Sequence, residues 1–320
     1  MNDQEKINIA VKVARMYYYQ NMQTKEIAEE INTSRSTVSR LLSFAKNEGL
    51  VNIHIVDPSD EPQLLEKKIL DEYHLEKVQV VPVPEITGEA EWLNRTAHFA
   101  AKRLNNLFDS DMILGLAWGT TVSAISSLLL PKSTYNSQIV QLNGAGSTQS
   151  MGIEYASDII MRFAENYSAR AHLFPVPAFF DYAETRVALW KERSIKRILD
   201  LQSKADLLLY SIGAPNAVVP SHVYSGGYLD EKDNAQLERL EVVGDIATYF
   251  FRRDGHFSEI PINERASGPS LDLFKQKYGV CVVSGLAKVP GLHAALKGGF
   301  MKELIVDEPT ARALINRMEK

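Results

Sequence analysis

Apolar residues recur at helical spacing through the first fifty residues, and this pattern predicts three short helices within residues 3–50. The second helix follows Thr24 and the third begins near Ser34; both are residue types that cap helix starts. Gly49 is a stop signal for the third helix. The expected apolar faces are Ile7, Val11, Ala14 and Tyr18 in the first helix and Ile27, Ala28 and Ile31 in the second.

Beyond residue 62, apolar runs of strand length alternate with longer helical patterns. The runs are VQVVPV, MILGLAW, QIVQLNG, ADLLLYSIG, VCVVSGL and ELIVDE. Strands that are apolar at nearly every position are buried on both faces, which indicates a parallel sheet covered by helices. The predicted fold class is therefore α/β, with a helical N-terminal domain followed by a Rossmann-like domain.

A turn-rich, acidic segment, DPSDEP, separates the helical pattern of the first fifty residues from the alternating strand and helix pattern that follows. We take residues 57–62 as a linker, residues 1–56 as the N-terminal domain, which closes with the β-prone piece VNIHIV, and residues 63–320 as the second domain. Several predicted strands of that domain end in glycine with small polar residues: WGTT, NGAGST, SIGAP and SGLAK. In open α/β sheets the ligand crevice lies at the carboxyl ends of the strands, so these segments predict a small-molecule site.

The third helix has two contrasting stripes. In a helix successive residues are rotated by about 100°, so the apolar residues fall on one stripe and the polar residues on the opposite stripe. The apolar stripe is expected to pack against the preceding helix. Because the connection between the two helices is short, the pair is expected to cross sharply as a helix-turn-helix. The apolar stripe is Val38, Leu41, Leu42 and Ala45, and the polar stripe is Ser36, Ser39, Arg40 and Ser43.

The polar stripe suits the major groove of DNA. Short hydroxyl side chains let a helix enter the groove, and an arginine can bond guanine O6 and N7 together. The alternative is an ordinary solvated face, but such faces usually mix Glu with Lys, and residues 34–45 contain no acid. The candidate DNA-binding residues are Ser34, Arg35, Ser36, Thr37, Ser39, Arg40 and Ser43.

Charge and composition add further constraints. The net charge is −5, and residues 1–56 hold seven Lys and Arg against six acids. Because phosphate neutralisation supplies much of DNA affinity, so neutral a domain should act as a dimer or higher oligomer. A single cysteine, Cys281, excludes an intramolecular disulfide and suits the cytoplasm. No apolar stretch has the length of a membrane span, and no signal peptide or metal-ligand cluster is evident.

Several motifs in one order resemble the SorC family of bacterial transcriptional regulators, and the deoxyribonucleoside-regulator branch most closely. They are MQTKEIAEEINTSRSTVSRLLSFAKNEGLVNIHI, GLAWGTT, QLNGAGS, SIGAP, VVGDIATYFF and SGLAKVPGLHAAL. The resemblance implies a helix-turn-helix domain and an effector domain similar to sugar-phosphate isomerases and glucosamine-6-phosphate deaminases. It also implies a phosphorylated sugar as effector, operator DNA as partner, and assembly as a dimer or tetramer.

The same resemblance implies an effector site, and the residue chemistry agrees with it. A phosphate needs amide and hydroxyl donors and a cation, whereas a carboxylate can accept bonds from sugar hydroxyls. Thr120 could instead cap a helix, Asp245 could cap a helix over DIATYFF, and Lys288 could be a solvated lysine. The candidate effector-binding residues are Gly119, Thr120, Thr121, Asn143, Gly144, Gly146, Ser147, Thr148, Asp245 and Lys288.

One position departs from the resemblance. The deoxyribose-sensing branch implies a lysine at the end of the third strand, where it could form a Schiff base with an open-chain sugar phosphate. Asn143 occupies that position here. An amide cannot form an imine, so the effector is expected to bind non-covalently, and deoxyribose 5-phosphate is a doubtful ligand.

Two functions from different classes remain at this stage. The first is a regulator without catalytic residues, whose binding to DNA is controlled by the effector. The second is a sugar-phosphate isomerase or deaminase with an appended helical domain. Against the enzyme, the histidines are scattered singly along the sequence and no acid–histidine cluster gathers near the glycine loops.

Overall fold

The computed structural model divides the chain into two compact units, Met1–Asp60 and Glu61–Lys320. It describes all residues except 1–2, 21, 52–60, 85, 148–152, 216, 220 and 319–320. VNIHIV therefore lies almost wholly outside the described residues, as does most of the predicted linker. The last two linker residues, Glu61 and Pro62, instead begin helix α4, where proline is tolerated because first-turn amides need no helical partner.

The first unit is a bundle of three helices, α1 (Asp3–Tyr18), α2 (Thr24–Glu30) and α3 (Arg35–Asn47). Its core contains the whole predicted apolar stripe of α3 together with Ile27 and Ala28 of α2. On α1 the buried face is centred on Ala10, Val13 and Ala14, so Ile7 and Val11 lie at its margin. Thr24 is the first residue of α2 rather than its cap; Gln23 holds the cap position, and its amide donates to Glu26 Oε2 at 2.7 Å.

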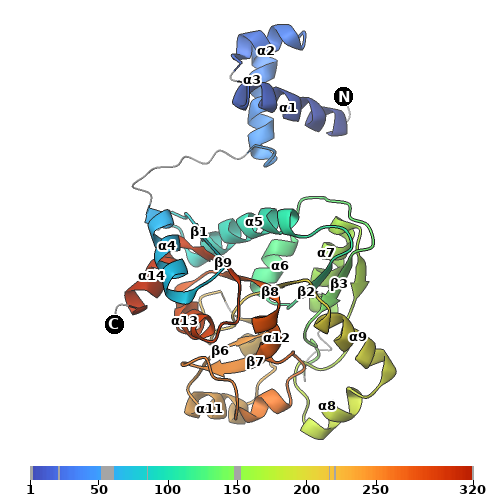
Figure 1. The fold of residues 1–320 in the computed structure, drawn as a ribbon, viewed down its shortest axis with the longest axis vertical. Coiled ribbons are helices and arrows are strands. Elements are labelled where there is room, and N and C mark those ends of the chain that lie inside the picture. The colour runs from blue at the N-terminus through green and yellow to red at the C-terminus, as the bar shows by residue number, and fades with distance from the viewer. Residues whose placement is uncertain are drawn as a thin grey trace. The chain divides into compact units, whose positions relative to one another are not determined.

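The second unit is built on a parallel sheet of seven strands in the order β1-β9-β8-β5-β2-β3-β4 (Figure 1). All six predicted strand runs form strands of this sheet; only the short β4 was not predicted. The bounds are β1 Lys77–Val81, β2 Ile113–Leu116, β3 Gln138–Gln141, β4 Arg170–His172, β5 Leu207–Tyr210, β8 Tyr278–Val283 and β9 Glu303–Asp307.

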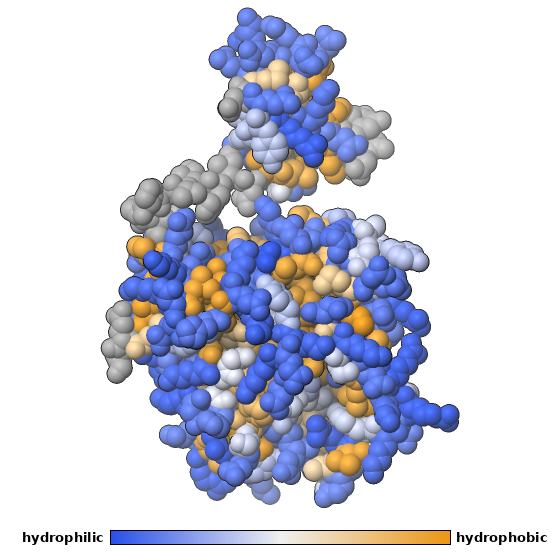
Figure 2. Space-filling model, in the orientation of Figure 1, coloured by the Kyte–Doolittle hydropathy of each residue, from blue (hydrophilic) through white to orange (hydrophobic). Residues whose placement is uncertain are grey.

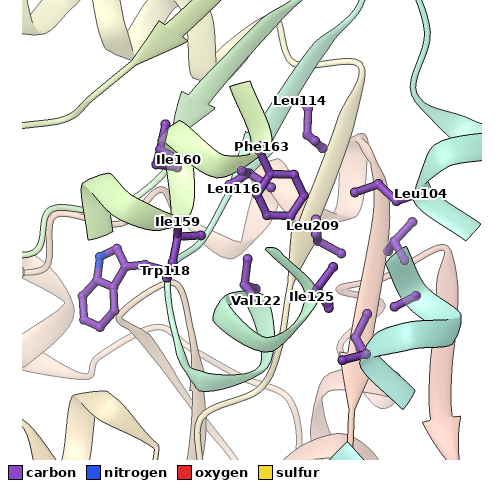
Figure 3. Close-up of a cluster of buried hydrophobic side chains, with 14 of the residues drawn as sticks. Leu104, Leu114, Leu116, Trp118, Val122, Ile125, Ile159, Ile160, Phe163 and Leu209 are labelled. Atoms are coloured by element: carbon purple, nitrogen blue, oxygen red, sulfur yellow. The ribbon is translucent and has the colours of Figure 1, made fainter. Parts of the chain in front are cut away.

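Continuous apolar strands are required because both faces of the sheet are covered. In β8, Val280 and Val282 face one core, whereas Cys281 and Val283 face the other. One face packs against α5 (Glu89–Leu107), α6 (Thr120–Ser126) and α7 (Ile153–Tyr167). The other packs against α4 (Glu61–Tyr73), α12 (Leu271–Gln276), α13 (Val289–Lys297) and α14 (Glu308–Met318). Figure 3 shows side chains of α5, α6 and α7 converging on β2 and β5, with Trp118 at the edge of the cluster.

The remaining elements surround the carboxyl ends of the strands or the β3–β4 side. They are α8 (Ala183–Leu189), α9 (Arg193–Ser203), α10 (His222–Ser225), α11 (Glu231–Arg239) and the 3₁₀ turns η1 (Pro261–Glu264) and η2 (Leu286–Lys288). Hydrophilic residues cover most of the surface on the face of the second unit shown in Figure 2. None of the helices in the described part of the chain combines the length and the apolar character of a membrane span.

The segment DIATYFF is a hairpin and not a helix, which corrects one of the alternatives weighed for Asp245. β6 (Val242–Ile246) and β7 (Tyr249–Arg252) pair antiparallel, and Asp245 lies within β6. Ala247 and Thr248 form the turn with φ of 50° and 67°, the left-handed geometry that two-residue hairpins need. The aromatic residues that follow, Tyr249, Phe250 and Phe251, favour a strand.

Candidate functional site

The turn between α2 and α3 fixes how the candidate DNA-binding helix begins. Asn32 has φ of 50°, and the Thr33 amide donates to the Ala28 carbonyl at 2.8 Å, which closes the end of α2. Ser34 caps α3 as predicted, because its Oγ accepts from the Thr37 amide at 3.2 Å. The same Oγ lies 2.8 Å from Ser36 Oγ, so this hydroxyl is already committed to the helix start.

The polar stripe of α3 faces solvent along its whole length. Ser36, Ser39, Arg40 and Ser43 are exposed, as are Ser34 and Arg35, and Thr37 is half-buried. Arg40 Nε donates to the Ser36 carbonyl at 3.3 Å, which leaves the terminal nitrogens of the guanidinium pointing outward for other acceptors. The stripe is therefore a hydroxyl-rich surface with one arginine, Arg40, and it is flanked by the exposed Arg35. The opposite face of the helix packs into the core.

The second candidate site lies at the topological switch point of the sheet. From β2 the chain continues through β3 to β4 at one edge, whereas from β5 it continues through β8 and β9 toward the other edge. A crevice opens between the carboxyl ends of β2 and β5, where such sheets bind ligands. It is lined by Gly119, Thr120, Thr121, Asn143, Asp245 and Lys288 among the predicted residues, and by Trp118, Ser211, Gly213, Ser221, His222 and Thr248 among others.

Lys288 supplies a buried cation to this crevice rather than a solvated side chain. It is 7% exposed, and its Nζ donates to Thr121 Oγ1 and to Ser211 Oγ, each at 3.2 Å. Burial lowers the pKa of Lys288 to about 8, although Asp245 and Asp307 act in the opposite direction. An ammonium group has three donors, so the third remains for an acceptor in the crevice.

The loop that carries Lys288 is fixed by a buried carboxylate. Gly285 has φ of 109°, a conformation that side chains rarely adopt, and its amide donates to Asp307 Oδ2 at 3.1 Å and to Thr310 Oγ1 at 3.0 Å. Asp307 also accepts from the Thr310 amide at 2.8 Å. These bonds join the end of β8 to the start of α14, so the position of η2 and its lysine is determined by the packed sheet.

Asp245 faces Lys288 from the β6–β7 hairpin. Its Oδ2 accepts from the Thr248 amide at 3.1 Å, whereas its Oδ1 is buried with no hydrogen-bond partner among the described residues. Burial raises the pKa of Asp245 to about 7, while the Thr248 amide and Lys288 lower it. The Asp245 carboxylate can lie this close to the loop after β5 only because residue 213 is glycine: a Cβ at Gly213 would lie 2.0 Å from Asp245 Oδ1.

An aromatic cluster borders the crevice, and two of its residues, Trp118 and His222, line it. The His222 and Tyr155 rings stack with centroids 4.4 Å apart, and Trp118 lies 5.7 Å from His222 and 5.3 Å from Tyr228. Trp118 Nε1 donates to the Gly144 carbonyl at 2.9 Å, which fixes the indole against the end of β3. Burial lowers the pKa of His222, so its ring is neutral near pH 7.

The predicted effector residues divide into several environments. Gly119, not Thr120, holds the cap position of α6. Gly144 is buried and donates its amide to Ser267 Oγ at 2.8 Å, so it packs behind the crevice. Gly146 and Ser147 line a different cavity, beside Tyr228 and Arg265. Thr148 lies outside the described residues.

The candidate residues chosen from the sequence did not include Ser211 or His222, which both line the crevice. Ser211 directly follows β5 and begins SIGAP, a segment that the strand-end rule selected without naming a candidate residue in it. His222 comes from a loop whose path depends on tertiary packing, and no local signal places it there. Among the described residues, no group of three or more His, Cys, Asp or Glu could hold a metal ion.

Comparisons with known proteins agree along nearly the whole chain. A family model described as "Putative sugar-binding domain" matches residues 57–316. The deoxyribonucleoside regulator of Bacillus subtilis is 33% identical over 317 residues, which cover 98% of this chain and 99% of that protein. The sorbitol operon regulator of Klebsiella pneumoniae is 26% identical and covers 98% of this chain and 100% of its own length.

Solved structures show the same fold. A domain of a "possible sugar-binding transcriptional regulator" from Arthrobacter aurescens superposes with a TM-score of 0.75 at 48% identity, covering 81% of this chain and all of that domain. The full-length sorbitol operon regulator from Klebsiella pneumoniae superposes with a TM-score of 0.72 at 24% identity, covering 97% of this chain and 99% of that one.

Proposed function

Because this chain belongs to the SorC family of sugar-binding transcriptional regulators, we propose that a phosphorylated sugar in the crevice between β2 and β5 controls its attachment to operator DNA. The operon is one for carbohydrate utilisation, as in the sorbitol and erythritol regulators that resemble this chain. Such a regulator acts in the cytoplasm.

The phosphate group binds at the Lys288 side of the crevice. Lys288 is a buried cation whose third donor is available, and Thr121 and Ser211 already orient it. This arrangement is the single observation that carries the proposal, because a charge-assisted bond to a phosphate oxygen is strong where water is excluded. Gly119, with φ of 152°, lets the backbone approach the same group without a side chain in the way.

The sugar hydroxyls bind on the opposite side, at Asp245 and Asn143. Each has a buried side-chain oxygen, Oδ1, without a hydrogen-bond partner among the described residues. A buried acceptor without a donor is unfavourable, and two sugar hydroxyls would satisfy both. A sugar ring can also pack on the aromatic cluster around Trp118 and His222, since both residues line the crevice.

The effector binds without a covalent bond and without turnover. Asn143 replaces the lysine that could form an imine, and Lys288 is held by two hydroxyls on the phosphate side. The characterised proteins that resemble this chain are named as regulators. An assay with pentose and hexose phosphates tests this point, because product formation near 1 s⁻¹ would indicate an enzyme.

The reading of DNA is assigned to the polar stripe of α3, and the binding form is a dimer or tetramer. The stripe offers hydroxyls and Arg40 to base edges and phosphates, and Arg35 flanks it. Residues 1–56 carry seven cations against six acids, so one copy neutralises few phosphates and a paired site is needed. The effector changes DNA affinity by binding one arrangement of the oligomer more tightly than another.

The decisive experiment combines an effector screen with a DNA-binding assay on the full chain. A thermal-shift screen compares phosphorylated sugars with their free counterparts, and phosphorylated members should raise the Tm by mass action. Operator fragments selected from genomic DNA are then titrated with and without the active compound. If free sugars stabilise the protein and phosphorylated ones do not, the assignment of Lys288 as phosphate ligand is wrong.

A further inference from the structure

A shallow hollow beside α9 gathers positive charge on a chain whose net charge is −5. Four cationic residues and one acid line it: Arg193, Lys196, Arg197 and Lys204, with Asp200. It lies beside Gln138, where β3 begins, and therefore at the opposite end of the strands from the effector crevice. Hydrophilic residues cover the margin of the second unit near α9 (Figure 1 and Figure 2).

These cations are not used to hold the protein together. All four are exposed, and within the described part of the chain no carboxylate lies within ion-pairing distance of any of them. Other arginines of the same unit differ: Arg103 forms a two-bond pair with buried Glu303, at 2.7 and 2.9 Å. The hollow therefore presents charge that the fold does not neutralise.

The placement of the charge opposes helix stability. Arg193, Lys196 and Arg197 fall within the first five residues of α9; the N-cap residue is Glu192, but no acid occupies the first turn. The positive end of the helix macrodipole disfavours cations there by some tenths of a kcal/mol each. The positive charge also acts on a nearby histidine: burial lowers the pKa of His172, and Arg170 and Arg197 lower it further. An anion that binds the hollow would relieve both effects.

We propose that the α9 hollow is a second DNA contact, which binds the phosphate backbone of a duplex without reading its sequence. This inference rests on the proposed function, because it concerns the same partner as the α3 stripe. Arg193, Lys196 and Arg197 lie on α9, a helix of 11 residues, and Lys204 is its C-cap residue. The row from Arg193 to Lys204 spans about 16 Å at about 1.5 Å per residue, which is long enough to contact several phosphates of one strand.

The exposure of the cations favours a polyanion over a small ligand. A single phosphorylated metabolite at an exposed site would be held weakly, because water and salt screen each pair over about 8 Å. DNA gains affinity differently, since each neutralised phosphate releases condensed counterions and the contributions add. Contacts of this kind also compensate for the low positive charge of residues 1–56.

The test measures how DNA affinity depends on salt, using the full chain and a random-sequence duplex of about 40 base pairs. The variant replaces Arg193, Lys196, Arg197 and Lys204 by Gln, a good helix former. The matched control replaces four other exposed cations of the same unit by Gln: Lys232, Arg239, Arg253 and Lys297. A plot of the logarithm of the association constant against the logarithm of salt concentration has a negative slope. The magnitude of this slope should decrease by about 2 or more in the α9 variant and remain near wild type in the control.

The outcomes separate this inference from the proposed function. If wild-type protein binds no duplex, DNA binding itself fails. If it binds and the α9 variant keeps the wild-type slope, only the second contact is wrong. The α9 variant should keep its Tm or gain slightly, and its thermal shift with sugar phosphates should not change. A changed oligomeric state by sedimentation would assign the cations to a subunit contact and overturn the proposal.

Discussion

The ammonium nitrogen of Lys288 lies 3.2 Å from the hydroxyl oxygen of Thr121, although the two residues are 167 positions apart in the chain. The bond joins the loop after β8 to the first turn of α6, so it spans the switch point of the sheet. The bond orients the cation of the crevice in the absence of a ligand. Preorganisation of this kind strengthens binding because less ordering is needed when the ligand enters.

Replacing Lys288 by Met should separate binding from stability. The variant loses two hydrogen bonds but also the cost of burying a charge, so its free energy of unfolding should stay within about 1 kcal/mol of wild type. Affinity for a phosphorylated sugar should fall about 100-fold, which corresponds to about 2.7 kcal/mol. Calorimetric titration measures this loss. Lys288→Arg keeps the charge and should retain more of the affinity; equal affinity in all three proteins would contradict the assignment.

Asp245 should make stability depend on pH. Its folded pKa, about 7, lies above the unfolded value near 4, so the native state holds the proton more tightly and stability falls as pH rises from about 4 to 7. Lys288 acts in another window: its folded pKa, about 8, lies below the unfolded value near 10.4, so stability rises with pH from about 8 to 10.4. The two charged groups are therefore most costly between pH 7 and 8.

Asp245→Asn isolates the first of these effects. Asn keeps an oxygen for the Thr248 amide but cannot ionise, so the variant should gain stability relative to wild type between pH 5 and 7.5, on the order of 2–3 kcal/mol. Urea unfolding at both pH values measures the difference. A constant gap between the two proteins across this range would show that Asp245 is not protonated in the folded state.

Gly213→Ala should disturb the site through shape alone. The new Cβ would lie 2.0 Å from Asp245 Oδ1 and 2.9 Å from Ser221 Oγ, so the hairpin and the loop must move apart. We expect a loss of about 2 kcal/mol in unfolding free energy and weaker effector binding. Gly88→Ala is the control, because no atom lies within 4 Å of its Cβ; it should cost at most about 1 kcal/mol, since Gly88 is the N-cap of α5, where glycine is favoured over alanine. Equal effects would exclude the steric explanation.

The strands of the sheet could be predicted because each is a continuous apolar run, which is visible in the local sequence. A run such as VCVVSG needs apolar residues at every position, since Cys281 and Val282 enter opposite cores. The apolar stripe of α3 was equally readable, because helical periodicity is a local property. Ser34 as a cap followed from residue type and position, and its bond to the Thr37 amide confirms it.

Long-range geometry could not be predicted in the same way. NGAGST is one continuous loop in sequence, yet Asn143 lines the crevice whereas Gly146 lines another cavity, because Gly144 turns inward to bond Ser267. The aromatic residues after Asp245 favour a strand, but the pairing of β6 with β7 that forms the hairpin depends on tertiary packing and on the left-handed turn at Ala247 and Thr248. The role of the effector residues follows from such placements and stays a prediction.

Arg40→Ala should lower both operator affinity and sequence discrimination. An arginine that bonds a guanine contributes about 1–3 kcal/mol, so affinity for a selected operator should fall about 10-fold to 100-fold while binding to random duplex changes little. Lys46→Ala is the control, since it removes one exposed charge from the last turn of the same helix, whereas the N-terminal part of a recognition helix contacts the base edges. Fluorescence anisotropy on both duplexes gives the ratio of specific to random affinity. That ratio should drop only in Arg40→Ala; an equal drop in Lys46→Ala would show that the stripe contributes charge rather than base contacts.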